Sequence, residues 1–383
     1  MSPETRHQQK LPGLEVALLE RRKIREFHLT VSPLPGEELR GMLGRLGETL
    51  RENGAAVVRH SVFGAGAARG RTMKAMEPAL GPVDWPVSWI EGDEARRSNN
   101  GSADALAGMQ VMAVSGVPVE TVRLGGRVVG RMFSDGWARN FLAGDLTAAD
   151  TSAPPPEQAR QVFDLLAAAL GQAGMSMRDV ARTWLYLDDL LSWYKPFNEV
   201  RALFFREQGI LRGRLPASTG IHGRNPSGSA ILAGAWAVQP LDPAAAVREV
   251  PSPLQCPAPK YGSCFSRAME IAAPDLRRVL VSGTASIAPD GRSERPGDPR
   301  GQVDLTMEVV GAILQSRGLG FEDVTRAIAY FKRMPDAAAF RAWLADRGLD
   351  FFPTVSIQTD VCRDELLFEI ELDAAVVPEG RPA

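Results

Sequence analysis

Two segments of the chain share one pattern of apolar and polar positions. The first, FDLLAAALGQAGMSMRDVARTWLYL, begins at Phe163, and the second, MEVVGAILQSRGLGFEDVTRAIAYF, begins at Met307. Each starts with apolar residues at helical spacing, reaches a glycine, and passes through an Asp–Val pair into a β-rich run. The match predicts two copies of one supersecondary unit.

The order of elements is the same in both copies: two strands, a helix, a strand, a second helix and two closing strands. The second helix is NEVRALFFREQG in the first copy and DAAAFRAWLADRG in the second. Turn signals at Gly125–Gly126 and Asp290–Gly291 predict a hairpin ahead of the first helix of each copy. The sequence therefore predicts a mixed fold of helices and strands in each half.

A stretch rich in Pro and Ala separates the two copies near residues 240–258 and predicts a linker. We therefore expect an N-terminal extension at residues 1–50, a first domain at residues 51–245 and a second, catalytic domain at residues 246–383. The extension contains a helical pattern, GEELRGMLGRLGETLREN, whereas residues 51–120 suggest no clear order of elements.

The charge balance excludes several classes of partner. The 383 residues include 44 Lys and Arg and 46 Asp and Glu, a net charge of −2, which argues against binding to nucleic acid or to an anionic membrane surface. No apolar run approaches the roughly 18 residues of a membrane span, and MSPETRHQQK lacks the apolar core of a secretory signal. We expect a cytoplasmic protein that binds a small molecule.

The metal-binding residue types are sparse. Three cysteines are too few for a disulfide framework, and the four histidines show no HxxxH or HxH spacing. A zinc site needs three or four converging ligands. We therefore expect no metal.

The last two expected strands carry the most interesting polar residues. In FEIELD at residues 368–373, apolar side chains alternate with acids, so Glu369 and Glu371 share a face, and Cys362 joins them across the preceding turn. This face is either solvated or a polar cleft that contains a carboxylic acid. The first copy has Gly234 or a neighbouring Ala at the matching position, which favours a site in one copy only.

Two other segments collect cations and tyrosines. WYKPFNEVR contains Tyr194 and Arg201, and YGSCFSRA contains Tyr261 and Arg267. Arginine binds carboxylates through two parallel hydrogen bonds, so these residues suit a small dianionic substrate. The alternative is that both arginines form ordinary ion pairs.

Several stretches resemble the chorismatase family over roughly residues 80–377. They are SPLQCPAPKYGSCFSRA, VSGTASI, TMEVVGAILQSRG, RAIAYFK and DVCRDELLFEIELDA, with WYKPFNEVR and PASTGI in the first half. The resemblance implies an α+β fold with two tandem RidA/YjgF-like (chorismate-mutase-like) domains, each a β-sheet packed against two helices. Because such domains associate as trimers, we expect either a monomer or a homotrimer.

The resemblance also implies an enzyme of secondary metabolism that releases pyruvate from chorismate without a metal or organic cofactor. Glu369 matches the glutamate taken as the proton donor in the family. Cys362 lies seven positions earlier, as in members that form a hydroxybenzoate, so the expected product is 3-hydroxybenzoate, with 4-hydroxybenzoate and a dihydrodiol as the other outcomes. Candidate contacts to the two substrate carboxylates are Arg201, Arg267 and Lys332, and candidate hydroxyl contacts are Tyr194 and Tyr261.

Two other functions stay open. An enamine or imine deaminase of the RidA type would carry an Arg just after a Pro at the start of the penultimate strand, but the two copies read LPASTGI and FFPTVSI there. A non-catalytic protein that binds a small metabolite would keep the pocket and tolerate the loss of Glu369.

Overall fold

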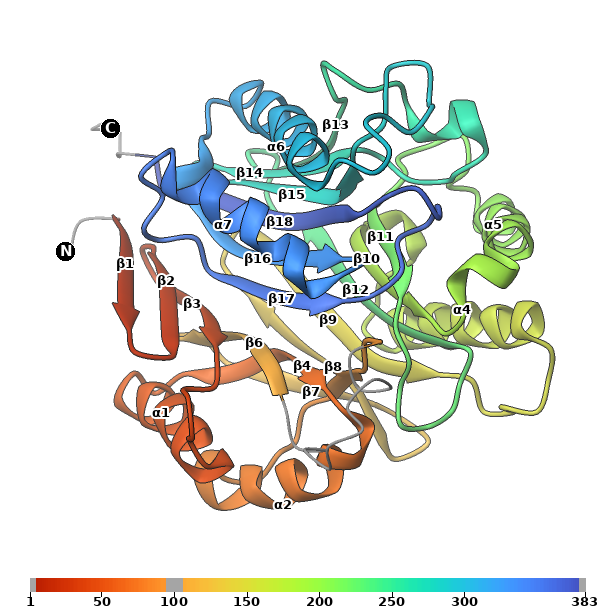
Figure 1. Cartoon of the computed structure of the whole chain (residues 1–383). Coiled ribbons are helices and arrows are strands. Elements are labelled where there is room, and N and C mark those ends of the chain that lie inside the picture. The colour runs from red at the N-terminus through yellow and green to blue at the C-terminus, as the bar shows by residue number, and fades with distance from the viewer. Residues whose placement is uncertain (1–4, 94–105, 379–383) are drawn as a thin grey trace.

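The computed structural model describes residues 5–93 and 106–378, apart from the side chain of Tyr261. Each consecutive third of the chain forms one six-stranded sheet with two helices on its outer face (Figure 1). The α+β fold class predicted from the sequence is therefore confirmed.

The first unit has the strand order β1-β2-β3-β6-β4-β5. All its neighbouring strands are antiparallel except β4 and β5, which the helix α2 connects as a parallel pair. Its elements are β1 (Thr5–Leu11), β2 (Leu14–Glu20), β3 (Arg25–Val31), α1 (Leu39–Glu52), β4 (Ala56–Gly64), α2 (Arg69–Leu80), β5 (Val87–Ile90) and β6 (Leu106–Ser115).

The second unit has the order β11-β10-β12-β9-β8-β7, and the third has β13-β14-β15-β18-β16-β17. The second comprises β7 (Val119–Leu124), β8 (Arg127–Ser134), β9 (Ala138–Thr147), α4 (Pro155–Gln172), β10 (Val180–Leu187), α5 (Leu190–Glu207), β11 (Ala217–His222) and β12 (Ile231–Pro240). The third comprises β13 (Ala246–Val250), β14 (Ala268–Ala273), β15 (Leu276–Ala285), α6 (Pro299–Gln315), β16 (Val324–Phe331), α7 (Ala337–Ala345), β17 (Thr354–Gln358) and β18 (Phe368–Val376).

Local signals in the sequence set the bounds of the long helices. A proline occupies the first turn of both α4 and α6, and the Asp298 carboxylate accepts a hydrogen bond from the Gly301 N–H at the start of α6. Gly174 and Gly318 follow the two helices with φ of 68° and 69°, a conformation that suits glycine. The stops predicted from the repeat are confirmed.

The predicted division into an extension and two domains needs correction at its N-terminal side. β3 lies before residue 50 and β4 after it, yet both pair with β6 in one sheet. Residues 5–115 are thus a third copy of the unit, not an extension plus part of a larger domain at 51–245. The copy escaped detection because β4 reads AVVRHSVFG where β10 reads VARTWLYL: the apolar pattern is kept but few residues are identical.

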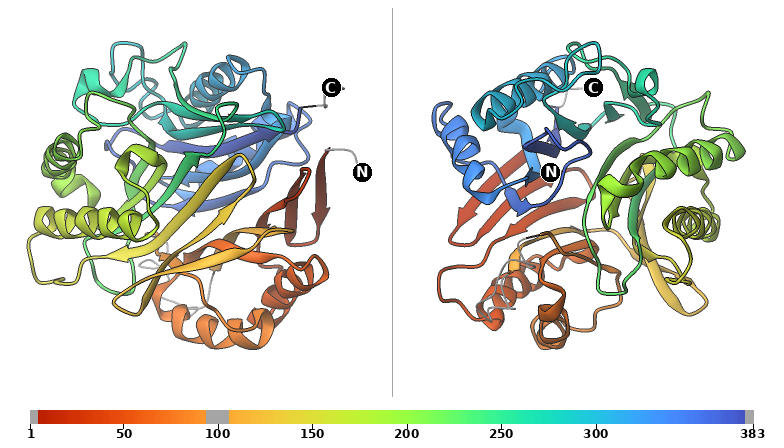
Figure 2. Two further views of the ribbon diagram at one scale, coloured as in Figure 1. Left: turned by 180° about the vertical axis from the view of Figure 1, so that it is seen from behind. Right: turned by 45° about the vertical axis from the view of Figure 1, so that its right-hand side comes forward.

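Successive units contact one another through their edge strands and close a ring within one chain (Figure 2). β5 lies against β9, β11 against β15, and β17 against β6. Apolar side chains of all three units fill the space between the sheets, for example Val58, Trp184 and Tyr330. Each unit also places one arginine beside a β-bulge at the same register position, namely Arg59, Arg182 and Arg326.

Charged side chains close one end of this ring. Arg21, in the turn between β2 and β3, is 4% exposed. Its guanidinium donates to Asp135 in the β8–β9 turn at 3.1 Å and to Asp275 in the β14–β15 turn at 3.3 Å, and it also binds Glu26. One cation therefore joins corresponding turns of all three units.

Candidate active site

A cavity of about 590 Å³ lies between the second and third units. The second unit contributes α5 and β11, and the third contributes residues 262–267, β15, the β17–β18 loop and β18. Five of the seven residues predicted from the sequence line it: Tyr194, Arg201, Arg267, Cys362 and Glu369. The side chain of Tyr261 lies outside the described residues, and Lys332 lies outside the described lining.

Glu369 reaches the cavity from β18 and is 5% exposed. It packs against Gly283 at the bulge of β15, where a Cβ atom would collide with the Glu369 Oε1. Burial and the neighbouring charge of Glu371 raise the pKa of the Glu369 carboxyl to about 8, against the opposing effect of Arg267 and Arg182. Glu369 is therefore mostly an un-ionised acid near neutral pH and can donate a proton.

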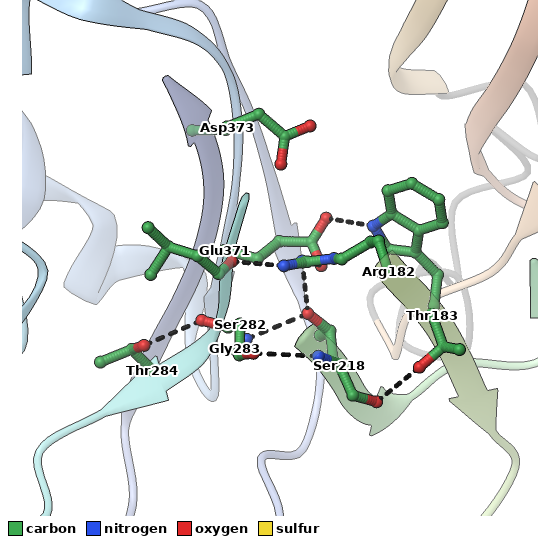
Figure 3. Close-up of polar contacts among 12 residues, drawn as sticks. Arg182, Thr183, Ser218, Ser282, Gly283, Thr284, Glu371 and Asp373 are labelled. Atoms are coloured by element: carbon green, nitrogen blue, oxygen red, sulfur yellow. Dashed lines mark hydrogen bonds and ion pairs between the residues drawn. The ribbon is translucent and has the colours of Figure 1, made fainter. Parts of the chain in front are cut away.

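Glu371, two residues further along β18, is in the opposite protonation state. Arg182 donates to its Oε2 at 2.6 Å (Figure 3). Trp184 and Arg326 donate to its Oε1 at 2.8 and 2.9 Å. Burial alone would raise its pKa, but the two arginines outweigh burial and lower the pKa to about 2. Because this face of β18 is buried, the interpretation of it as a solvated outer face is wrong.

Two guanidinium groups reach the cavity around one aromatic ring. Arg201 Cζ lies 5.9 Å and Arg267 Cζ lies 5.6 Å from the centroid of the Phe265 ring. Arg201 donates to the Asn198 Oδ1 at 2.5 Å, and Arg267 donates to the Cys256 carbonyl at 3.0 and 2.9 Å. Both cations are thus held in place at the cavity wall, at positions where they can face anionic groups of a ligand.

Tyr194 and Cys362 add neutral polar groups. Tyr194 follows Trp193, whose non-helical φ and ψ of −139° and 16° kink α5 at the cavity. Burial raises the pKa of the Tyr194 hydroxyl well above its usual value. Burial and the proximity of Glu369 raise the pKa of the Cys362 thiol to about 12. Because the thiolate is the reactive form of cysteine, Cys362 is unsuited to act as a nucleophile here.

Lys332 lies at the outer side of the β17–β18 loop. Its ammonium donates to the Oδ1 and to the carbonyl oxygen of Asp364, each at 2.5 Å, and lies 3.8 Å from the Asp360 Oδ1. On the other side of the loop, Arg363 donates to the Gly291 carbonyl at 2.8 Å. The loop that carries Cys362 is therefore fastened at two points.

Comparison with known proteins gives these residues a context. No protein-family model matches the chain. Two curated proteins named chorismatase, from Streptomyces hygroscopicus and Streptomyces rapamycinicus, are 28% and 29% identical over 211 and 231 residues. The alignments cover 50% and 55% of this chain but only 60% and 66% of the two relatives, so the match spans less than two thirds of their length.

The chain is similar to the chorismatases. This confirms the resemblance predicted from the sequence motifs. A chorismatase crystal structure aligns over 91% of this chain and 98% of its own, with a TM-score of 0.60 and 18% sequence identity. The chorismatase fold is therefore shared along nearly the whole chain, including the first unit that the sequence motifs did not cover.

The strand register shows which residue of the second unit stands at the position equivalent to Glu369. Glu369 pairs with Tyr330, and the corresponding pair is Leu232 with Tyr186. The match of Glu369 to Gly234 or a neighbouring Ala, predicted from the sequence, is therefore wrong, and Gly234 lies two residues from Leu232 along β12. The inferred asymmetry itself is confirmed, because an apolar side chain stands where the third unit has an acid.

The interface between the first and second units shows the consequence. A pocket there encloses only about 10 Å³, and its lining includes β5, β9 and β12, the counterparts of β11, β15 and β18 at the 590 Å³ cavity. Leu232 lines it, and Arg59 lies over the Trp184 ring with its Cζ 3.6 Å from the ring centroid. The described pocket at this interface is therefore far smaller than the cavity that contains Glu369.

Three further residues shape the site but were missed from the sequence: Phe265, Gly283 and Arg182. Phe265 and Gly283 lie inside the motifs SCFSRA and VSGTASI, so they could have been selected by their place in those motifs. Arg182 lies in the repeated β-rich run ARTWLYL, where its charge among apolar residues was the available signal. Arg182 acts by binding Glu371 of the third unit, and the sequence around Arg182 does not reveal a contact with a distant segment.

Among residues 5–93 and 106–378, no group of three or more His, Cys, Asp or Glu side chains could hold a metal ion. None of the helices in these ranges is both long enough and apolar enough to cross a membrane.

Proposed function

We propose that this chain catalyses the release of pyruvate from chorismate and leaves a hydroxybenzoate, with 3-hydroxybenzoate as the expected product. The observation that carries the proposal is the un-ionised Glu369 in a cavity with two guanidinium groups. A carboxylic acid with a pKa of about 8 holds its proton near neutral pH, which a general acid requires. The relatives named chorismatase support this choice of substrate.

The substrate chemistry fits these residues. Chorismate carries two carboxylates and an enol ether, and protonation of the terminal methylene carbon of the ether gives an oxocarbenium ion. Glu369 supplies that proton, while Arg201 and Arg267 bind the carboxylates. Tyr194 lines the same cavity, is kept neutral by burial, and contacts the ring hydroxyl in this proposal.

The aromatic product follows from a balanced sequence of steps. The neighbouring ring hydroxyl attacks the ring carbon that bears the ether, the carbon–oxygen bond breaks, and its electron pair becomes the carbonyl of pyruvate. The proton of the hydroxyl returns to the Glu369 carboxylate. Opening of the three-membered ring, with transfer of the ring C–H proton to oxygen, gives the hydroxybenzoate, and no water is consumed. Cys362, as a neutral thiol, occupies space beside Glu369 in which a water molecule would otherwise lead to a diol.

The test is incubation of the purified protein with chorismate, without added cofactor, followed by chromatography of pyruvate and ring products. Pyruvate with 3-hydroxybenzoate in equal amounts supports the proposal, and Glu369→Gln should abolish both. Pyruvate with a dihydrodiol contradicts the role of Cys362. Chorismate binding without pyruvate release would point instead to a metabolite-binding protein.

We also propose that the chain is a monomer. The ring of three units closes within one chain, so the interfaces that a trimer of single domains would form between subunits are already occupied. Light scattering on a size-exclusion column should give the mass of one 41.4 kDa chain. A mass three times larger would overturn this proposal.

A further inference from the structure

Glu371 is a buried charge that the proposed reaction does not use directly. It is 0% exposed and lies outside the described lining of the cavity. Because side chains two residues apart on a strand share a face, Glu371 lies next to Glu369 on β18. A buried carboxylate at this position requires an explanation, since removing its charge from water is unfavourable unless it is paired.

The charge of Glu371 is fixed by groups from different units. Arg182 and Trp184 come from β10 of the second unit, and Arg326 comes from β16 of the third. Arg326 is itself bound by Gln110 of the first unit at 3.1 Å and by Asp373 at 2.5 Å. These contacts lower the pKa of Glu371 to about 2 and keep it ionised near neutral pH.

A chain of hydrogen bonds joins this group to the wall of the cavity. The Arg182 guanidinium that binds Glu371 also donates to the Thr219 Oγ1 at 2.8 Å. The same Oγ1 accepts the Gly283 N–H at 3.1 Å (Figure 3). Gly283 packs against the Glu369 carboxyl, so the group that fixes Glu371 also fixes the backbone beside Glu369.

Glu371 is one of several titratable or charged groups around Glu369. The others belong to α5, β10, β14 and its preceding segment, β16 and the β17–β18 loop, and they are Tyr194, Arg182, Arg267, Tyr330 and Cys362. The tyrosines and the cysteine are neutral near pH 7, and the two arginines favour ionised Glu369. Glu371 is therefore the one negative charge in this set.

We propose that Glu371 is a positioning residue whose fixed negative charge keeps Glu369 in its acid form before each turnover and favours the return of the proton afterwards. The inference rests on the proposed function, because it assigns a task to Glu371 through Glu369. Without that charge, Arg182 and Arg267 would favour the carboxylate of Glu369, and a smaller fraction of the protein would hold the reactive proton at neutral pH.

The test is the pH dependence of kcat/KM for pyruvate release in Glu371→Gln, which keeps the shape of the side chain. We expect the alkaline limb to move to lower pH by about one unit or more, the size of shift that a neighbouring charge produces. Activity at pH 5–6 and KM for chorismate should stay close to those of the unchanged protein. A merely structural role would lower activity at every pH without moving the limb.

The matched control is Asp373→Asn. Asp373 is the next acid on the same face and is 1% exposed, but its described partner is Arg326 and it is further from the cavity. This variant should keep the alkaline limb in place. If Glu371→Gln does not fold, the double variant Arg182→Gln/Glu371→Gln removes the ion pair together and should shift the limb in the same direction. A folded variant of either kind with an unchanged limb would overturn the inference.

A measurement without substrate separates this inference from the proposed function. Carbon NMR of protein labelled at the glutamate carboxyls follows the titration of Glu369, assigned by its loss in Glu369→Gln. The Glu369 signal should titrate at lower pH in Glu371→Gln than in the unchanged protein. If that shift is observed while chorismate yields no pyruvate, the proposed function fails but the coupling of the two acids stands. If pyruvate is released and the signal does not shift, the inference alone fails.

Discussion

Gly283 and Glu369 face each other across neighbouring strands with no room for a further carbon atom between them. A Cβ atom on Gly283 would collide with the Glu369 Oε1, and its next neighbour would be the Cγ2 of Thr219 at 3.2 Å. The contact is possible because β15 has a bulge between Val281 and Thr284 that brings the backbone of Gly283 to this point. The absence of a side chain at Gly283 therefore defines where the acid of Glu369 lies.

This contact predicts a large effect of Gly283→Ala on pyruvate release. The added methyl group must push the Glu369 carboxyl aside, and a misplacement of about 1 Å lowers rates by about 100-fold. Steady-state assays should show the loss in kcat. Gly171→Ala is the matched control, because an added Cβ there meets nothing within 4 Å, and it should retain full activity.

The second prediction concerns the product. Cys362→Ala should still release pyruvate, because Glu369 remains, but should form a dihydrodiol in place of part or all of the hydroxybenzoate, since the smaller side chain admits water. Chromatography of the ring products measures the ratio. Cys256→Ala keeps the backbone carbonyl that binds Arg267 and should leave the ratio unchanged. An unaltered product in Cys362→Ala would remove this residue from the site.

Lys332 and Arg267 were both expected to bind carboxylates, and the structure separates them. The Lys332 partner Asp364 is 87% exposed, and such surface pairs contribute at most about 1 kcal/mol. Lys332→Met should therefore change kcat/KM by no more than about fivefold. Arg267→Met should raise KM for chorismate at least about tenfold, because it removes a charged hydrogen-bond donor from the cavity. A comparable rise of KM in Lys332→Met would contradict this assignment.

A fourth prediction follows from the raised pKa of Glu369. In the folded protein this carboxyl keeps its proton up to a pKa of about 8, whereas in the unfolded chain it ionises near 4.5. A group with a raised pKa favours the folded state below its unfolded value, and that contribution is lost as the pH rises toward 8. Glu369→Gln, which cannot ionise, should therefore raise Tm relative to the unchanged protein at pH 8 and have little effect at pH 4. Equal differences at both pH values would contradict the shift.

The sequence predicts those features that depend on local pattern. Alternation in FEIELD places Glu369 and Glu371 on one face, and the repeat predicts α4, α6 and the glycines that follow them. The different states of the two acids could not be predicted, because Arg182 and Trp184 come from another unit and are brought to β18 only by the closed ring. Lys332 was misjudged for a related reason: its charge suits a substrate, but the fold turns it toward Asp364.

The first unit was missed because identity between copies is low where the units have specialised. The pairing register of the strands shows which positions of the units correspond, even where the residues differ. Leu232 pairs with Tyr186 as Glu369 pairs with Tyr330.

Residue identity does not distinguish Leu232 from Gly234 as the counterpart of Glu369, because the two lie on the same face of β12. Matching Glu369 to Leu232 or to Gly234 keeps the same alternation of side chains between the two faces of β12. The two matches differ only in the residue of β10 that each pairs with, Tyr186 or Trp184.

The turns joined by Arg21 illustrate what fusion of three units in one chain permits. In a ring of identical subunits, every substitution occurs three times, and three copies of an aspartate such as Asp135 or Asp275 would meet at the threefold axis and repel one another. Covalent linkage removes this restriction, so one turn carries an arginine opposite two aspartates. For the same reason, β18 can carry the acid Glu369 while its counterpart β12 carries Leu232. Because the three units need not be identical, one interface of the chain can hold the reactive cavity while the other interfaces stay closely packed and support it.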